Sequence, residues 1–76
     1  MFLNTFFADR LQSLRKSKQI SQQQLADHLN LNKSAISRME SGQRAASIEV
    51  IYQLSDYFDV SIDYLVGRTD NPKVNK

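Results

Sequence analysis

The stretch QQQLADHLNLNKSAISRM, residues 22–39, decides the fold of this chain. Its apolar residues recur at intervals of three and four, the spacing of an amphipathic helix, on both sides of the short segment NLN. Asn30 can adopt the left-handed backbone conformation that ends one helix, and Asn32 can cap the next. We therefore predict one helix from Ser21 to about His28 and another from Lys33 to Met39 or Glu40.

Two alanines indicate how these helices meet. Helices joined by so short a connection cannot run antiparallel, so they cross at a wide angle and need a close contact. Ala26 and Ala35 have side chains small enough to allow that contact. Larger apolar residues surround it on the side of the core: Leu25, Leu29, Leu31, Ile36 and Met39. This arrangement is much more specific than amphipathicity, and it predicts a helix-turn-helix motif.

The outward face of the second helix of the motif is polar. If Ile36 and Met39 turn inward, the residues left on the outside are Lys33, Ser34, Ser37 and Arg38. Arg and Lys match the O6 and N7 atoms of guanine in the major groove, and Ser can bond to any base. These four residues are therefore candidates for base contacts, although without the surrounding helix-turn-helix pattern a solvated helix face would be the preferred interpretation.

The rest of the chain has helical spacing too, with no stretch that alternates as a strand does. Three more helices are predicted: one from about Phe6 to Ser17 with Asn4 or Thr5 as its N-cap, one from Ser47 as cap to Phe58, and one from Ser61 as cap to Gly67. Their buried residues are predicted to be Phe7, Leu11 and Leu14, then Ile48, Ile51, Leu54 and Phe58, then Ile62, Leu65 and Val66. The fold class is therefore all-α with five helices.

Polar residues and glycine mark further helix boundaries. Ser21 and Gln24 have the spacing of a capping box. Gly42 lies where a left-handed residue should end the helix that begins at Lys33, and a loop is expected over residues 43–46.

The bulk properties place limits on the class of protein. The 76 residues contain no cysteine and have a net charge of +2, too small to indicate a polyanion partner. Residues 1–46 contain seven basic and three acidic side chains, whereas residues 47–76 contain three basic and five acidic ones. We expect one domain over residues 1–67, a polar flexible tail over residues 68–76, and a cytoplasmic location, since neither a membrane span nor an export signal is present.

Two segments together resemble a known family. RLQSLRKSKQISQQQLADHLNLNKSAISRMESGQR, followed by SIEVIYQLSDYFDVSIDYLVG, is similar to the Cro and phage-repressor (C1-type, XRE-like) helix-turn-helix domains, over Arg10–Gly67. The resemblance implies the five-helix lambda-repressor-like fold, with the motif at residues 22–41, and double-stranded operator DNA as the partner. It also implies a bacterial or phage origin.

The resemblance implies roles for individual residues. Lys33, Ser34, Ser37 and Arg38 match base-contacting positions. Gln22, Gln23, Gln43 and Arg44 match positions beside phosphates, and a helix N-terminus near Gln22 favours an anion there. Arg15 and Glu40 match a partly buried ion pair that joins the first helix to the third. Candidate dimer contacts are Ile62, Tyr64, Leu65 and Val66, with core packing as the alternative for Ile62 and Leu65.

The sequence departs from the family pattern at two places. Asn30 stands where the family most often has glycine. The segment Met1–Phe7 is unusually apolar, which favours packing against the fourth and fifth helices or, alternatively, self-association.

These features favour a transcriptional regulator, a repressor that binds a palindromic operator as a homodimer. The alternative is a protein-interaction module such as an antitoxin or a regulatory subunit. An enzyme is disfavoured, because His28 is the only histidine, the chain has no cysteine, and no carboxylate pair suggests a site. No cofactor, metal or small-molecule ligand is expected.

Overall fold

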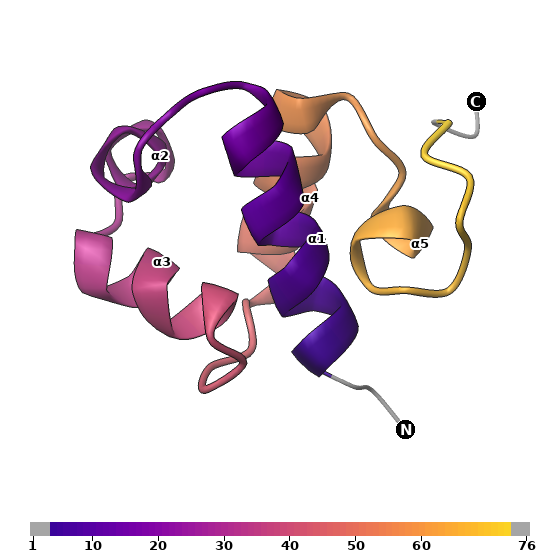
Figure 1. The fold of residues 1–76 in the computed structure, drawn as a ribbon, viewed down its shortest axis with the longest axis horizontal. Coiled ribbons are helices and arrows are strands. Elements are labelled where there is room, and N and C mark those ends of the chain that lie inside the picture. Colours follow the sequence, from indigo (N-terminus) through magenta and orange to yellow (C-terminus); the bar gives the residue numbers. More distant parts are fainter. Residues whose placement is uncertain (1–3, 74–76) are drawn as a thin grey trace.

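Five α-helices follow one another in the part of the chain that the computed structural model describes, residues 4–73 (Figure 1). Their bounds are α1 Asn4–Ser17, α2 Gln22–Leu29, α3 Lys33–Glu40, α4 Ile48–Phe58 and α5 Ile62–Leu65. The all-α prediction and the helix order are confirmed.

Each helix from α2 to α5 begins directly after the residue that the sequence predicts as its N-cap, and two predicted left-handed residues lie just after the ends of α2 and α3. Four side-chain oxygens accept hydrogen bonds from backbone N–H groups at the starts of α2, α3, α4 and α5: those of Ser21, Asn32, Ser47 and Ser61. The capping box is complete, because the Gln24 side chain also accepts from the backbone N–H of Ser21 at 2.7 Å. Asn30 and Gly42 have φ values of 59° and 80°, the left-handed conformation predicted for both.

The predicted start of α1 is wrong. Asn4 and Thr5 already belong to the helix, so neither is the non-helical residue that an N-cap requires. Phe7 is fully buried, whereas Phe6 is half exposed and lies against Gly67. The tertiary contacts of this turn of α1 therefore outweigh the local polar signal. Residues 1–3, the start of the apolar segment, lie outside the described residues.

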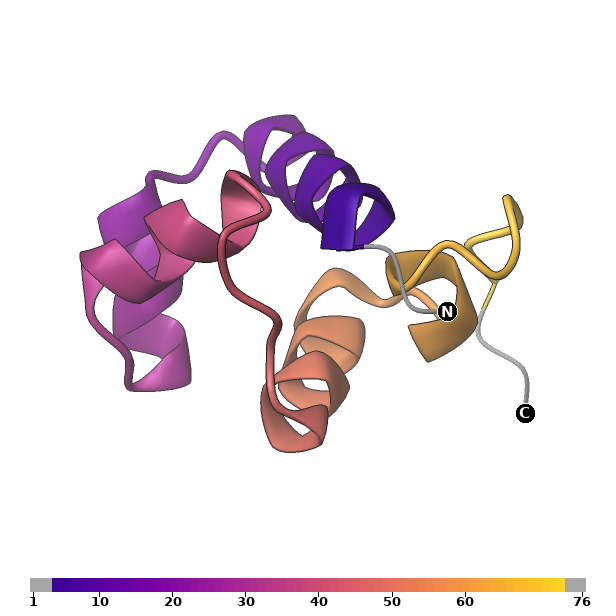
Figure 2. The same cartoon turned by 90° about the horizontal axis from the view of Figure 1, so that it is seen from below.

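The helices α2 and α3 lie together at one end of the molecule and α5 lies at the other, with α1 and α4 between them (Figures 1 and 2). The helix α1 contacts both α3 and α5, so it connects the two ends. The largest fully buried side chains come from every helix: Phe7, Leu11, Leu25, Ile36, Met39, Leu54 and Leu65. Ala26 and Ala35 are buried as predicted.

One predicted core residue lies at the surface. Ile48 is 73% exposed, although Ile51, Leu54 and Phe58 of the same helix are buried. Ile48 is the first residue of α4 and lies beyond the reach of the core. In the other predicted faces, Leu14, Ile62 and Val66 are partly buried and pack against the core.

No helix within residues 4–73 has both the length and the apolar character needed to cross a membrane.

Candidate nucleic-acid interface

The two faces of α3 differ as the sequence predicts. Ala35, Ile36 and Met39 are buried against the rest of the domain. The four candidate base-contacting residues are all exposed: Lys33, Ser34, Ser37 and Arg38. A polar and partly cationic surface therefore covers the outer side of a short helix whose inner side is anchored in the core.

The turn between α2 and α3 is held by backbone hydrogen bonds. The N–H of Leu31 donates to the carbonyl of Ala26 at 2.8 Å, and the N–H of Asn30 donates to Asp27 at 3.3 Å. Leu31 packs against the core, and the Asn32 side chain accepts from the N–H of Ala35 at 2.8 Å. These contacts fix the direction in which α3 leaves the turn, and hence the orientation of its polar face.

The predicted ion pair between Arg15 and Glu40 joins α1 to the last residue of α3. Arg15 Nε lies 2.6 Å from Glu40 Oε2, and Nη2 lies 3.0 Å from Oε1. The two side chains are only 12% and 2% exposed. A third nitrogen of Arg15 donates to the carbonyl of Ile20 at 2.8 Å. The hydrogen bond with Glu40 raises the pKa of Arg15 against the opposing effect of burial, and the charge of Glu40 raises it further.

Gln22 belongs to the same network. Its Nε2 donates to Glu40 Oε1 at 3.1 Å, and its side chain is half-buried. A carboxamide nitrogen has two hydrogens, so one N–H remains for another acceptor. The carboxylate of Glu40 therefore orients a candidate phosphate-contacting residue on α2 while it anchors α3. The sequence indicated no contact between Gln22 and Glu40.

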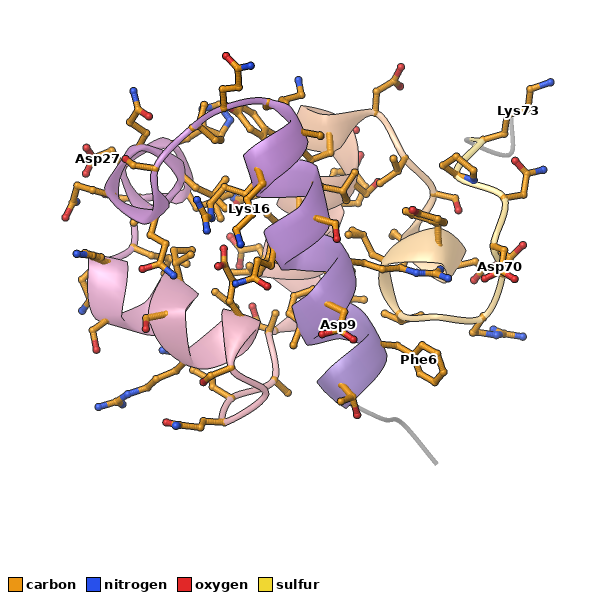
Figure 3. The ribbon with its side chains drawn as sticks, viewed as in Figure 1. Phe6, Asp9, Lys16, Asp27, Asp70 and Lys73 are labelled. Carbon is orange, nitrogen blue, oxygen red and sulfur yellow. The ribbon has the colours of Figure 1, made fainter. Side chains whose placement is uncertain are left out.

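Gln23, also a candidate for phosphate contact, is exposed on α2. Its Nε2 donates to Asp27 Oδ1 at 2.9 Å. Asp27 lies on the outer side of α2 (Figure 3).

The loop after α3 folds back on the helix that precedes it. The N–H groups of Gln43 and Arg44 donate to the carbonyl of Arg38 at 2.9 and 3.3 Å. Both side chains are exposed. Gly42, with its positive φ, allows this reversal. The two loop side chains therefore start from a backbone fixed to the last turn of α3, beside the candidate base contact Arg38.

The candidate dimer residues of α5 differ in exposure. Leu65 is fully buried, so its side chain serves the core, the alternative noted for it above. Ile62, Tyr64 and Val66 are partly buried and pack against the same core. The aromatic ring of Tyr64 is also covered by the guanidinium of Arg10, whose central carbon lies 4.2 Å from the ring centroid.

Arg10 is a contact centre that the sequence did not reveal. It donates to the backbone carbonyls of Tyr64 and Thr69, and its Nη2 lies 2.7 Å from Asp70 Oδ1. Asp70 lies beside α5 (Figure 3). The backbone N–H of Ser61 donates to the carbonyl of Pro72 at 2.9 Å. The first residues after Gly67 thus lie against α1 and α5, and the flexibility expected for residues 68–76 stays a prediction.

His28 has a structural contact at the surface. It is exposed, and its ring centroid lies 4.2 Å from that of Tyr57. Lys18 lies over the same tyrosine ring at 5.1 Å. Among residues 4–73, no group of His, Asp and Glu side chains could hold a metal ion.

The sequence and the fold match known proteins. Residues 11–65 match the family model described as helix-turn-helix. The regulator AnsR of Bacillus subtilis is 47% identical over 60 residues, which are 79% of this chain and 52% of AnsR. The uncharacterised regulator YqaE of the same species is 35% identical over 68 residues, which are 90% of this chain and 59% of YqaE. The chain thus spans between half and three fifths of the length of these relatives.

A solved structure shares the fold. The restriction-modification controller protein C.AhdI of Aeromonas hydrophila superposes with a TM-score of 0.72 at 34% identity, over 82% of this chain and 90% of C.AhdI. The chain belongs to the XRE/C1-type helix-turn-helix family of transcriptional regulators. Members of this family are non-enzymatic proteins that bind double-stranded DNA.

Proposed function

We propose that this protein regulates transcription by binding a palindromic operator as a dimer, with α3 of each copy in the major groove. The observation that carries the proposal is the contrast between the two faces of α3. Ala35, Ile36 and Met39 anchor the helix, and four exposed residues that can all hydrogen-bond cover its other side. A partner protein would favour aromatic or aliphatic anchors on that face, so its polarity favours DNA.

The proposed contacts divide into two groups. Lys33, Ser34, Ser37 and Arg38 contact base edges, with the two cations suited to guanine. Gln22, Gln23, Gln43 and Arg44 contact the backbone on either side and set the register of α3 in the groove. In this arrangement Glu40 is a positioning residue, because it holds both α3 and the side chain of Gln22.

The dimer follows from the size of the domain. A single small module buries too little DNA for a useful preference over the many non-specific sites of a genome. Two copies related by a two-fold axis would contact half-sites about 34 Å apart on one face of the duplex. Bound within a promoter in the bacterial cytoplasm, such a dimer excludes the polymerase, so we propose repression as the outcome.

The test is selection of binding sites from random DNA duplexes with the full chain. The expected result is a palindromic consensus with half-sites about one helical turn apart. A Lys33→Ala/Arg38→Ala variant should enrich no consensus, whereas the control Arg68→Ala/Lys73→Ala, which removes the same charge outside α3, should enrich the original one. No enrichment with the unmodified protein, or equal loss in both variants, would contradict the proposal.

A further inference from the structure

Two large apolar side chains of α4 remain at the surface. Ile48 is 73% exposed and Tyr52 is 60% exposed. They are four residues apart, so they lie next to each other on the same face of the helix. Single apolar residues at a surface need no explanation, but this face presents two large ones on consecutive turns.

This face adjoins the proposed DNA-contacting loop. Ile48 directly follows the cap Ser47 and is four residues beyond Arg44. The loop from α3 leads into the end of α4 that lies farthest from α1 (Figure 2). An object packed on Ile48 and Tyr52 would therefore lie close to the DNA that Arg44 is proposed to contact.

The helix α5 offers less apolar surface to another protein. Leu65 is fully buried, and the guanidinium of Arg10 covers the ring of Tyr64. Residues 69–72 lie against α1 and α5, held by the ion pair of Asp70 and the hydrogen bond of Pro72. The chain itself thus occupies part of the surface around α5.

We infer that Ile48 and Tyr52 form the contact between two copies of this chain bound to neighbouring half-sites, an inference that rests on the proposed function. In a two-fold interface the same surface meets itself, so Ile48 of one copy can pack on Tyr52 of the other and the reverse. The occupant is therefore a second copy, and the dimer contact lies on α4 rather than on α5.

The small area of this face determines when the contact forms. A stable dimer buries about 800 Å² of each partner, from roughly 20 to 30 residues. Two side chains provide only a small part of that area, so this contact alone does not hold two free copies together. DNA that holds two copies side by side raises their effective concentration, and the weak contact then becomes cooperative binding.

The experiment compares the binding of the full chain to two duplexes built from the selected consensus, one with a single half-site and one with both. The unmodified protein should occupy the second half-site with an affinity raised about 5- to 150-fold. The variant Ile48→Gln/Tyr52→Gln removes the apolar surface without a change in charge. It should lose this increase and keep the affinity for a single half-site.

A matched control is Phe6→Gln, which removes an aromatic side chain that is 48% exposed on α1. It should keep the cooperativity, and thermal melts should show that all variants fold. Cooperativity lost in the Phe6 variant but kept in the α4 variant would overturn the inference. A free dimer that the α4 substitutions leave intact would also overturn it.

The two proposals fail in different ways. Binding to a single half-site without cooperativity in the unmodified protein would overturn only the inference about α4. Absence of binding to the duplex that contains both half-sites would overturn the proposed function.

Discussion

Arg15 and Arg10, both on α1, fasten the two ends of the molecule in different ways. Arg15 holds α3 through Glu40, and both of these side chains are almost completely buried. Arg10 holds α5 and the residues after it, but its carboxylate partner Asp70 is fully exposed, and its other two hydrogen bonds go to backbone carbonyls.

The difference shows which interactions hold the helices at each end in position. Two buried charges stabilise α3 only as a pair, because either charge alone would remain desolvated and uncompensated. At the other end water can replace the exposed carboxylate, so the carbonyls and the ring of Tyr64 carry the contact. The position of α3 therefore depends on a charge pair, and the position of α5 depends on hydrogen bonds to the backbone and on packing.

Arg15→Ala tests the first half of this comparison and should have the largest effect. It leaves the carboxylate of Glu40 buried without its cation, which costs about 3–5 kcal/mol of the free energy of unfolding. Denaturant unfolding followed by circular dichroism measures the loss. The control Arg15→Met/Glu40→Met removes both charges and should recover most of it, whereas an equal loss in the double variant would contradict the explanation.

Alanine substitutions at two glycines with similar backbone conformations test how tightly each end of the molecule is packed. In Gly42→Ala, at the end that contains α2 and α3, the new methyl group meets nothing within 4 Å, so only the positive φ lowers the stability, by about 1–2 kcal/mol. Gly67→Ala at the other end brings a methyl group within 2.6 Å of Phe6, which adds about 1–3 kcal/mol. Equal stabilities of the two variants in denaturant would show that Phe6 does not pack on Gly67.

Arg10→Ala tests how α5 is held. It removes the cation over Tyr64 and the donor to two carbonyls, and we expect a loss of about 2 kcal/mol. Arg10→Lys keeps the charge but not the planar group, so thermal unfolding should place it between the alanine variant and the unmodified protein. If the lysine variant is as stable as the unmodified protein, the charge alone holds α5.

Asp70→Asn should have the smallest effect. The side chain of Asp70 is fully exposed, so its ion pair with Arg10 is solvated and screened by salt. We expect a melting temperature equal to that of the unmodified protein at both low and high salt. A clear loss that disappears in high salt would move the weight of the contact from the carbonyls to the ion pair.

The local features of the fold were predictable, because they depend on neighbours in the sequence. Each N-cap accepts a hydrogen bond from a residue within one turn, as Ser21, Asn32, Ser47 and Ser61 do. The left-handed conformation of Asn30 depends only on the backbone preference of that residue. The buried and exposed faces of α3 followed from the helical period. Every candidate base contact lies on α3, so its exposure could be predicted from the sequence.

Features that depend on how helices are placed were not predictable in the same way. The partners of Arg10 are 54 to 60 residues away in the chain, and no spacing rule connects them. The pair of Arg15 and Glu40 was expected only from the family resemblance. The spacing of α4 put Ile48 in the core because periodicity describes the direction of a side chain and not where the core ends.

The most direct test of the central claim compares the sequence preferences of Arg38→Ala and Arg44→Ala, each by selection from the same random duplexes. If the outer face of α3 contacts bases, Arg38→Ala loses about 1–3 kcal/mol on the selected site and relaxes the preference at one base pair of each half-site. Arg44→Ala should weaken binding to all duplexes alike and leave the consensus unchanged. An unchanged consensus for Arg38→Ala would contradict the account, because α3 would then not determine which DNA is bound through this residue.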